Sequence, residues 1–510
     1  MNINSIKNKR RLVPRWRAFD KASSTGELAS NKKKQDIDIS FDEDIHFTRS
    51  KERWDKEKNI ENAAELLFHS ITHSRESDAI EPAIFIVRNR DKTSGNLPIL
   101  ADKIANGKAG TGRHLNENQT ENLLDLKSSI YVAIHDLKVK LHSWPNNAIY
   151  WVEIARLYTA IGQIEKADRA ISTSLQLARK NRYVVRSAIR FYTHTRDFDK
   201  LTKLFKSHHS LYEDQWILSS YVALQDKLRK PQLKIKAVRN KIERLDDSDV
   251  TELVGALASL ELEAGSIRAA KKHFERSALK PNDNSLAQLS WVRDKIGVVS
   301  TNREYNIPYI HEAKSRDYFM DGSYENSLSS TIDWMLDEPF SSIPATTGSY
   351  IASSFTDNLE CAAQFCELGL LANPNDMMLL NNYTVVLARS GKVEEAYNQF
   401  KKIRIEEDNN VSKVTMLATY GLLLMRGGFI DDGRSSYQRS IELSKKINSK
   451  ETSALAAINF ALEELNLAKP DFELASKVFT QNEMQDGPNH IEFMQEKVKN
   501  RMLRRLQEPY

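Results

Sequence analysis

The residues best spaced for metal chemistry are a glutamate and two histidines four positions apart. Glu65, His69 and His73 fall on one face of a helix predicted within residues 51–90. Two histidines at i and i+4 have metal-ligand spacing. The H-E-x-x-H pattern is missing, however, and no further ligand lies close in sequence. We therefore interpret this stripe as an exposed polar face, and we predict no metal and no cofactor.

Other patterns that could support catalysis are incomplete. The glycine-rich stretch 107–112 (GKAGTG) resembles a phosphate-binding loop only superficially. A P-loop requires G-x4-G-K-[ST] between a strand and a helix, and neither the order nor the strand is present. A surface connection is the better interpretation. No G-x-S-x-G motif occurs and no spacing pairs carboxylates for acid–base work, so we predict no catalytic residue and no enzyme.

A stripe of arginines is the strongest candidate for binding. Arg182, Arg186 and Arg190 lie four apart on one predicted helix, with Tyr183 and His194 nearby. Arg156 lies 34 positions before Arg190. Converging guanidinium groups suit carboxylate or phosphate recognition through forked hydrogen bonds. The alternative is a solvated face that Glu153 or Asp197 neutralises, because surface charge pairs are common and weak.

The N-terminal arm is basic and contains aromatic residues. Its cations and aromatics are suited either to docking on the rest of the chain or to binding a partner, and cations with rings available for stacking also suit phosphates and bases. No known nucleic-acid-binding motif accompanies them, so nucleic acid is the less favoured partner. The candidate residues of the arm are Lys9, Arg10, Arg11, Arg15, Trp16 and Arg17.

Composition limits the class of protein and its compartment. The 510-residue chain carries a net charge of only +5, so any basic patch must be local. Cys361 and Cys366, the two cysteines, are expected on different faces of one helix, which disfavours a disulfide or a zinc site and favours the reducing cytoplasm. No apolar run approaches the roughly 20 residues of a membrane span. The arginine- and lysine-rich start leaves a mitochondrial presequence as an alternative.

The stretch from Trp151 to Leu175 (WVEIARLYTAIGQIEKADRAISTSL) reveals the repeat. Apolar residues recur at helical spacing up to Tyr158, Gly162 interrupts them, and a second stripe begins at Ala167. This pattern predicts two amphipathic helices joined by a tight turn. A 34-residue step recurs from Ala133 to Ala167, from Tyr158 to Tyr192 and from Ala362 to Ala396.

This pattern closely resembles the tetratricopeptide repeat (TPR), W-x2-L-G-x2-Y followed by A-x3-F, over roughly residues 120–480. The resemblance implies an all-α fold, a TPR-like α-solenoid built as a superhelix of antiparallel helix pairs. The first helix of each pair would line the concave side and bind peptides or partner proteins. It also implies that Asn381 and Asn382 hold a peptide backbone, although the lysines of a two-carboxylate clamp are missing. One unit has Arg196 in place of the turn glycine.

These observations predict an ordered set of regions along the chain. They are a flexible basic arm (1–50), an N-terminal helical segment (51–119), a first TPR-like half (120–296), a loop or bend (297–306), a second TPR-like half (307–480) and a C-terminal basic capping helix (481–510). A polar cap is what the end of a solenoid requires.

The function we expect is that of a non-catalytic scaffold or regulatory subunit. It would bind a protein or peptide partner on its concave surface, without a membrane. The alternative is a sensor or specificity subunit of a multi-protein effector, such as a bacterial toxin or phage-defence system. There the basic patches would contact nucleic acid or a phosphorylated ligand.

Overall fold

The computed structural model describes residues 12–19, 45–72, 75–93, 96–105, 123–207, 213–228, 235–245, 247–296, 307–404 and 410–507. Throughout these ranges the regular elements are helices, without a strand. The chain forms two compact units. Unit 1 comprises Met1–Leu12, Lys234–Met335 and Ser341–Tyr510, and unit 2 comprises Val13–Leu233 and Leu336–Phe340. The predicted all-α class is confirmed.

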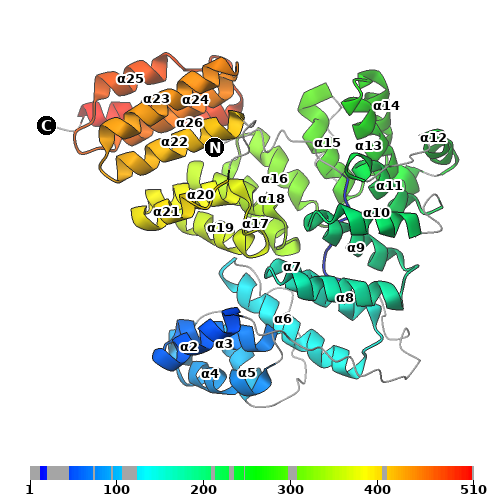
Figure 1. Cartoon of the computed structure of the whole chain (residues 1–510). Coiled ribbons are helices and arrows are strands. Elements are labelled where there is room, and N and C mark those ends of the chain that lie inside the picture. The colour runs from blue at the N-terminus through cyan, green and yellow to red at the C-terminus, as the bar shows by residue number, and fades with distance from the viewer. Residues whose placement is uncertain are drawn as a thin grey trace. The chain divides into compact units, whose positions relative to one another are not determined.

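The helical part of unit 2 begins earlier than predicted. Its first described helix starts at Ile45, whereas the sequence predicted a start near residue 51. A cluster of short helices packs beside α6, and regular pairs follow (Figure 1). The helices are α2 (Ile45–Lys56), α3 (Ile60–Thr72), α4 (Glu76–Arg88), η2 (Arg90–Lys92), α5 (Leu97–Ala105), α6 (Leu123–Ser143), α7 (Ala148–Ala160), α8 (Ile164–Leu177), α9 (Arg182–His194), α10 (Phe198–Ser207), α11 (Gln215–Leu224) and η4 (Gln225–Lys227).

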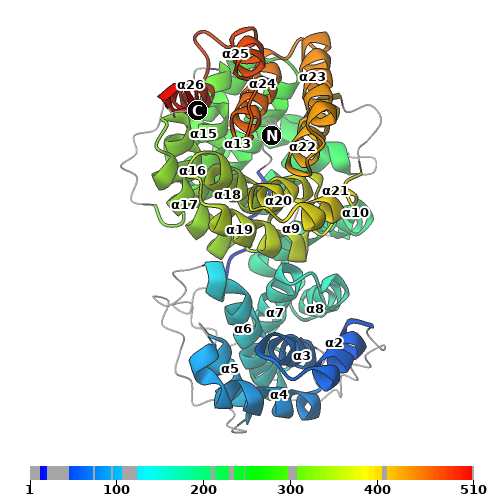
Figure 2. The same cartoon turned by 90° about the vertical axis from the view of Figure 1, so that its left-hand side faces the viewer.

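Unit 1 contains several successive antiparallel pairs and ends in one terminal helix. In Figure 2, α22, α23, α24 and α25 lie side by side in the orange to orange-red part of the chain. The helices are α12 (Ile235–Arg244), α13 (Asp247–Glu263), α14 (Ile267–Ser277), α15 (Asp283–Ile296), α16 (His311–Met320), α17 (Tyr324–Asp337), α18 (Ser342–Ser354), α19 (Leu359–Ala372), α20 (Met377–Arg389), α21 (Val393–Phe400), α22 (Asn410–Arg426), α23 (Ile430–Lys446), α24 (Lys450–Leu465), α25 (Phe472–Thr480) and α26 (Asn489–Gln507).

The turn inside each pair has a recurring geometry. Gly162, between α7 and α8, has a φ of 74°, and the amide of the next residue, Gln163, donates to the carbonyl of Tyr158 at 2.8 Å. This bond and the one from Gly162 to Thr159 close a Schellman turn, in which a left-handed residue satisfies the last carbonyls of a helix. Arg196 adopts the same conformation, with a φ of 58°. The turn therefore persists where the predicted glycine is absent.

Small residues set the spacing between the two helices of a pair. Ala155 on α7 and Ala167 on α8 are both fully buried. Their short side chains allow the two backbones to approach, and Ile171 and Tyr158 are buried in the same pair. Each pair buries only one face of its helices by itself, so stacking of neighbouring pairs completes the core. The predicted TPR-like helix pairs are confirmed.

Several predicted features lie outside the described residues. They are Lys9, Arg10 and Arg11 of the arm, the glycine-rich stretch 107–112, His73, and the predicted bend at 297–306. Among the residues that the structure does describe, none of the helices is long and apolar enough to cross a membrane.

Candidate functional site

The arm segment, which we define as residues 13–19, docks on the helices of unit 2. It forms neither helix nor strand, and buried and partly exposed residues alternate along it from Val13 to Arg17, as in an extended chain. Trp16 is completely buried, with its ring centroid 5.2 Å from that of Phe340 and 6.1 Å from that of Phe191. Of the two docking alternatives for the arm, the structure shows contact with the solenoid.

Two acidic residues hold the arginines on either side of Trp16. Arg15 Nη1 donates to Glu338 Oε2 at 2.6 Å, and Arg17 Nε pairs with Asp337. Both carboxylates are largely shielded from solvent, with exposed fractions of 2% for Glu338 and 11% for Asp337. Burial raises the pKa of Asp337 to about 6, an effect that Arg17 opposes and Glu338 reinforces. The segment therefore joins two cations to one buried acid, Glu338, and one largely buried acid, Asp337.

Two of the predicted binding residues lie beside the arm segment: Tyr183 contacts it directly, and Arg156 is linked to Tyr183 through Glu153. The Tyr183 phenol oxygen is 2.5 Å from Glu153 Oε1 and 3.1 Å from the carbonyl oxygen of Arg17. Burial, reinforced by Glu153, holds the pKa of Tyr183 well above its ordinary value, so the phenol keeps its proton as a donor. Arg156 pairs with Glu153 at 3.3 Å. A phenol thus contacts the arm backbone, and a buried ion pair supports the phenol.

The three arginines of the predicted stripe do not converge on one point. Arg182 pairs with Asp214 at 2.6 Å, and Arg186 donates to the carbonyl of Trp216 at 2.8 Å, so both are directed toward α11. Arg190 lies over the ring of Phe340, 4.8 Å from its centroid.

His194 also makes a T-shaped contact with the Phe340 ring, with centroids 5.7 Å apart. Arg190 and His194 therefore join the residues around the arm segment, and Arg182 and Arg186 do not. We call this surface the arm groove and define it by Tyr183, Arg190, Phe191, His194, Asp337, Glu338 and Phe340.

Asn381 and Asn382 occupy a different environment in unit 1. Both are fully buried on α20. Asn381 Oδ1 accepts from the Thr419 hydroxyl at 2.7 Å, and Asn382 Nδ2 donates to the Thr346 carbonyl at 3.1 Å. These bonds link α20 to α22 and to α18. In this structure the two amides connect neighbouring first helices and are not presented to a ligand.

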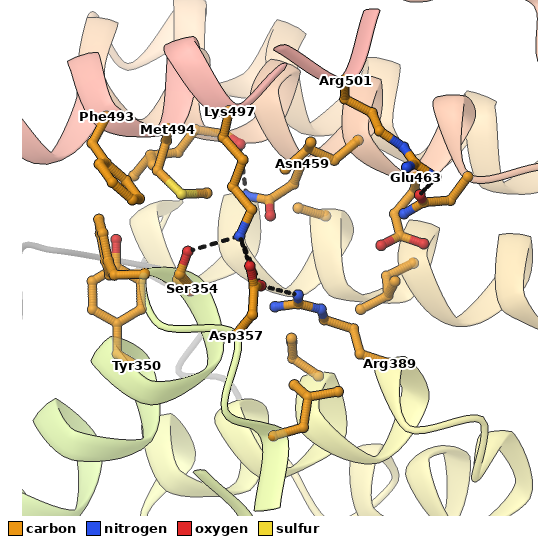
Figure 3. Close-up of a pocket in the computed structure, with 18 of the residues that line it drawn as sticks. Tyr350, Ser354, Asp357, Arg389, Asn459, Glu463, Phe493, Met494, Lys497 and Arg501 are labelled. Atoms are coloured by element: carbon orange, nitrogen blue, oxygen red, sulfur yellow. Dashed lines mark hydrogen bonds and ion pairs between the residues drawn. The ribbon is translucent and has the colours of Figure 1, made fainter. Parts of the chain in front are cut away.

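An open pocket of about 660 Å³ lies on the first helices of unit 1. It extends across α18, α20, α22 and α24, and α26 forms its remaining wall (Figure 3). Apolar residues such as Leu422, Leu455 and Met494 contribute to the lining. We call it the arginine pocket after its cations, which are Arg389, Arg426, Lys497, Arg501 and Arg504.

Acidic side chains compensate only part of this charge. The lining contains five cationic and three acidic residues, an excess of two positive charges. Glu463 receives two hydrogen bonds from Arg426, at 2.6 and 3.1 Å. The exposed Arg504 has no ion-pair partner among the described residues, and neither does Arg501, whose Nε is buried without a hydrogen bond. The pocket therefore favours an anionic ligand.

Asp357 lies between two of the pocket cations. Figure 3 shows Lys497 extending from α26 toward it and Arg389 approaching from α20. The Lys497 ammonium is 2.7 Å from both carboxylate oxygens, and Arg389 Nη2 is 3.0 Å from Oδ1. Burial opposes ionisation, but the hydrogen bond from Lys497 and that from Arg389 outweigh it and lower the pKa of Asp357. The residue is a carboxylate that bridges two cations.

The sequence contains a faint signal for part of this pocket. Arg389 and Arg426 each stand two positions before a turn glycine, Gly391 and Gly428, so both end the first helix of a pair. A cation at the same register of consecutive repeats predicts a column of charge along the inner helices. Lys497 and Arg501 give no such signal, because the packing of α26 brings them there.

The two cysteines are free in the structure. Burial raises the pKa of the Cys361 thiol to about 11 and that of Cys366 to about 12. Both are therefore neutral thiols near pH 7 and lack the thiolate character of a nucleophile. Within the described ranges, no group of three or more His, Cys, Asp or Glu residues is arranged to hold a metal ion.

Comparison with known proteins gives no match to a protein-family model or to a curated protein. Among solved structures, the APC/C hetero-tetramer Cut9–Hcn1 is similar, with 10% identity, a TM-score of 0.36 and coverage of 86% of this chain and 92% of that chain. Yeast Tom70 is 12% identical, with a TM-score of 0.30 and coverage of 89% of this chain and 97% of that chain. Naa15/Naa10 bound to HypK-THB is 12% identical, with a TM-score of 0.24 and coverage of 90% of each chain. The helix pairs and turns of the chain itself define its class, an all-α protein of TPR-like repeats.

Proposed function

We propose that this protein is a non-catalytic scaffold or regulatory subunit that binds a segment of a protein partner on the first helices of its repeats. The arginine pocket of unit 1 is the contact site. The observation that carries the proposal is an open cavity of about 660 Å³ that combines apolar walls with an excess of cations. Pockets of this size, with a few convergent polar groups, are typical of ligand sites.

The chemistry of the lining supports an acidic partner segment. Arg501 and Arg504 have no acidic partner among the described residues, and Arg501 Nε is a buried donor without an acceptor. A carboxylate from a partner would pair with the exposed guanidinium of Arg504, and charge-assisted hydrogen bonds are stronger than neutral ones. The apolar part of the pocket would bury the stem of the same segment.

A second candidate is the role of sensor or specificity subunit in a multi-protein effector. The excess of positive charge in the arginine pocket favours it too, because arginines recognise phosphate groups with the same forked geometry. The ligand would then be phosphorylated or a nucleic acid. A cytoplasmic place of action suits either role, since both thiols are free.

The test compares two charge-reversed forms of the full chain. Arg501→Glu/Arg504→Glu changes the pocket, and Lys445→Glu/Lys446→Glu makes the same charge change on exposed residues at the end of α23, outside the lining. Each form, and the unaltered chain, is used to capture partners from native lysate with and without nuclease, followed by mass spectrometry.

We expect a stoichiometric protein that withstands nuclease and that the pocket variant alone fails to retain. Equal retention by both variants would contradict the pocket as the contact site. A partner set that disappears with nuclease would instead favour the nucleic-acid role. Circular dichroism of each variant checks that the helices are intact.

A further inference from the structure

The arm segment has the features of a bound peptide and not those of a structural element. It contributes no helix to a pair, and its contacts with unit 2 include side-chain anchors placed at alternate positions. Pro14 and Trp16 are buried, and Arg15 and Arg17 extend to the acids. Pro14 also favours an extended backbone for its neighbour. Extended segments that bind helical repeats rely on such alternating anchors.

The arm groove is selective for the chemistry of this occupant. Phe191 and Phe340 form an aromatic slot that encloses the indole ring of Trp16. Glu338 is almost fully buried, and its ion pair with Arg15 supplies the opposite charge that a buried carboxylate requires. Removal of one partner of a buried pair is strongly unfavourable. An occupant of the groove must therefore combine a large aromatic ring with a cation on each side of it.

We infer that the arm groove is a binding site for extended peptides with a cation–aromatic–cation pattern, and that residues 13–19 are its intramolecular occupant. A partner segment of this chemistry binds by displacing the arm. The inference does not rest on the proposed function, because it concerns other residues, in unit 2, and a ligand of opposite charge.

The intramolecular occupant sets the affinity that a competitor needs. A tethered ligand competes at an effective concentration on the order of 1 mM for short tethers. A free peptide with a Kd in the micromolar range for the empty groove would therefore bind the intact chain far more weakly. The arm raises the threshold for binding, and its removal is expected to reveal the site.

The experiment uses the full chain and a fluorescent peptide with the sequence LVPRWRAF, which is that of residues 12–19. The variant Arg15→Ala/Trp16→Ala/Arg17→Ala withdraws the anchors of the arm, and binding is measured by fluorescence anisotropy. We expect the variant to bind the peptide at least tenfold more tightly than the unaltered chain. A peptide with alanine in place of its tryptophan is expected to lose this binding.

A second substitution tests the groove itself. In the triple variant, Glu338→Gln is expected to weaken peptide binding at least fivefold, because it removes the acceptor charge for one arginine. Glu325→Gln, an exposed acid in the first turn of α17, serves as the matched control and is expected to have no effect.

Absence of tight peptide binding by a triple variant with unchanged helicity would overturn the inference and make the arm a permanent part of the core. If the triple variant loses helicity, Arg15→Gln/Arg17→Gln keeps Trp16 in place and decides the question. This milder form is expected to bind the peptide more tightly than the unaltered chain, and equal binding would overturn the inference as well.

Discussion

Arg15 Nη1 lies 2.6 Å from Glu338 Oε2, although 323 positions separate the two residues in sequence. Glu338 is almost fully buried and Arg15 is partly exposed, and the pair flanks the indole ring of Trp16. Because a buried charge without its partner is strongly destabilising, this contact links the start of the chain to the segment that follows α17. Both residues belong to unit 2.

The first prediction concerns this pair. Arg15→Gln is expected to lower the local stability of the arm groove by about 3 kcal/mol, because it leaves Glu338 buried and unpaired. Arg15→Gln/Glu338→Gln is expected to cost less than the two single changes added together. Hydrogen exchange of the amides in 336–340 and in α9 measures the effect. Strict additivity would show that the two residues do not interact.

The second prediction concerns pH. Burial raises the pKa of Asp337 from 3.8 to about 6, against the opposing effect of Arg17. A folded-state pKa above the unfolded one means that the folded protein binds the extra proton. The stability this group contributes is therefore fully present below pH 3.8 and is lost as the pH rises through 6. The loss amounts to about 3 kcal/mol at most.

Asp337→Asn removes the titrating group and is expected to flatten this part of the pH profile. Melting temperatures of the unaltered chain and of the variant, recorded from pH 4 to 8, give the difference directly. The gap should change mainly between pH 4 and 6, in favour of the unaltered chain at the acidic end. Profiles that run parallel over the whole range would refute the assignment.

The third prediction concerns the turn between α9 and α10. Arg196 has a φ of 58°, a conformation that costs a residue with a side chain roughly 1–2 kcal/mol relative to glycine. Arg196→Gly is therefore expected to stabilise this turn by about 0.5 to 1 kcal/mol, after the greater freedom of glycine in the unfolded chain is included. Gly162→Ala, at the equivalent turn, should have the opposite effect. Hydrogen exchange at Asp197 and Gln163 reports each change.

Local pattern was sufficient to predict the helix pairs. The apolar stripes up to Tyr158 and from Ala167, with Gly162 between them, correspond to α7, its turn and α8. Each of these features depends on neighbours within about one turn of helix, and hydrophobic periodicity records such neighbours. Arg196 is instructive because the Schellman hydrogen bonds hold the turn even without the favoured residue.

The sites depended on contacts that no local pattern contains. Tyr183, Arg190 and His194 were selected from the sequence, but Asp337, Glu338 and Phe340 were not, since more than 140 positions separate the two groups. Helical spacing placed Arg182, Arg186 and Arg190 on one stripe. Their long side chains, however, contact different partners: two of them bind at α11, and the third lies over the ring of Phe340. Spacing gives the direction of a Cβ atom and not the end point of a flexible side chain.

The last prediction concerns Asp357, whose carboxylate pairs with two cations of the arginine pocket. A carboxylate from a ligand must compete with this internal one for Lys497 and Arg389. Asp357→Asn removes the competing charge and retains a residue that tolerates the φ of 53° found there. We expect it to strengthen binding of an acidic peptide several-fold and to make binding more sensitive to salt, because two further cations become available.

Fluorescence anisotropy with a labelled glutamate-rich peptide, at low and at physiological salt, measures this effect. Asp431→Asn is the matched control, because it removes an equal charge from an exposed residue on α23 that pairs with Arg434 outside the pocket. It should leave the affinity unchanged. If Asp357→Asn binds the peptide no better while its helicity is intact, Lys497 and Arg389 act to fasten α26 to the repeats and do not receive a ligand.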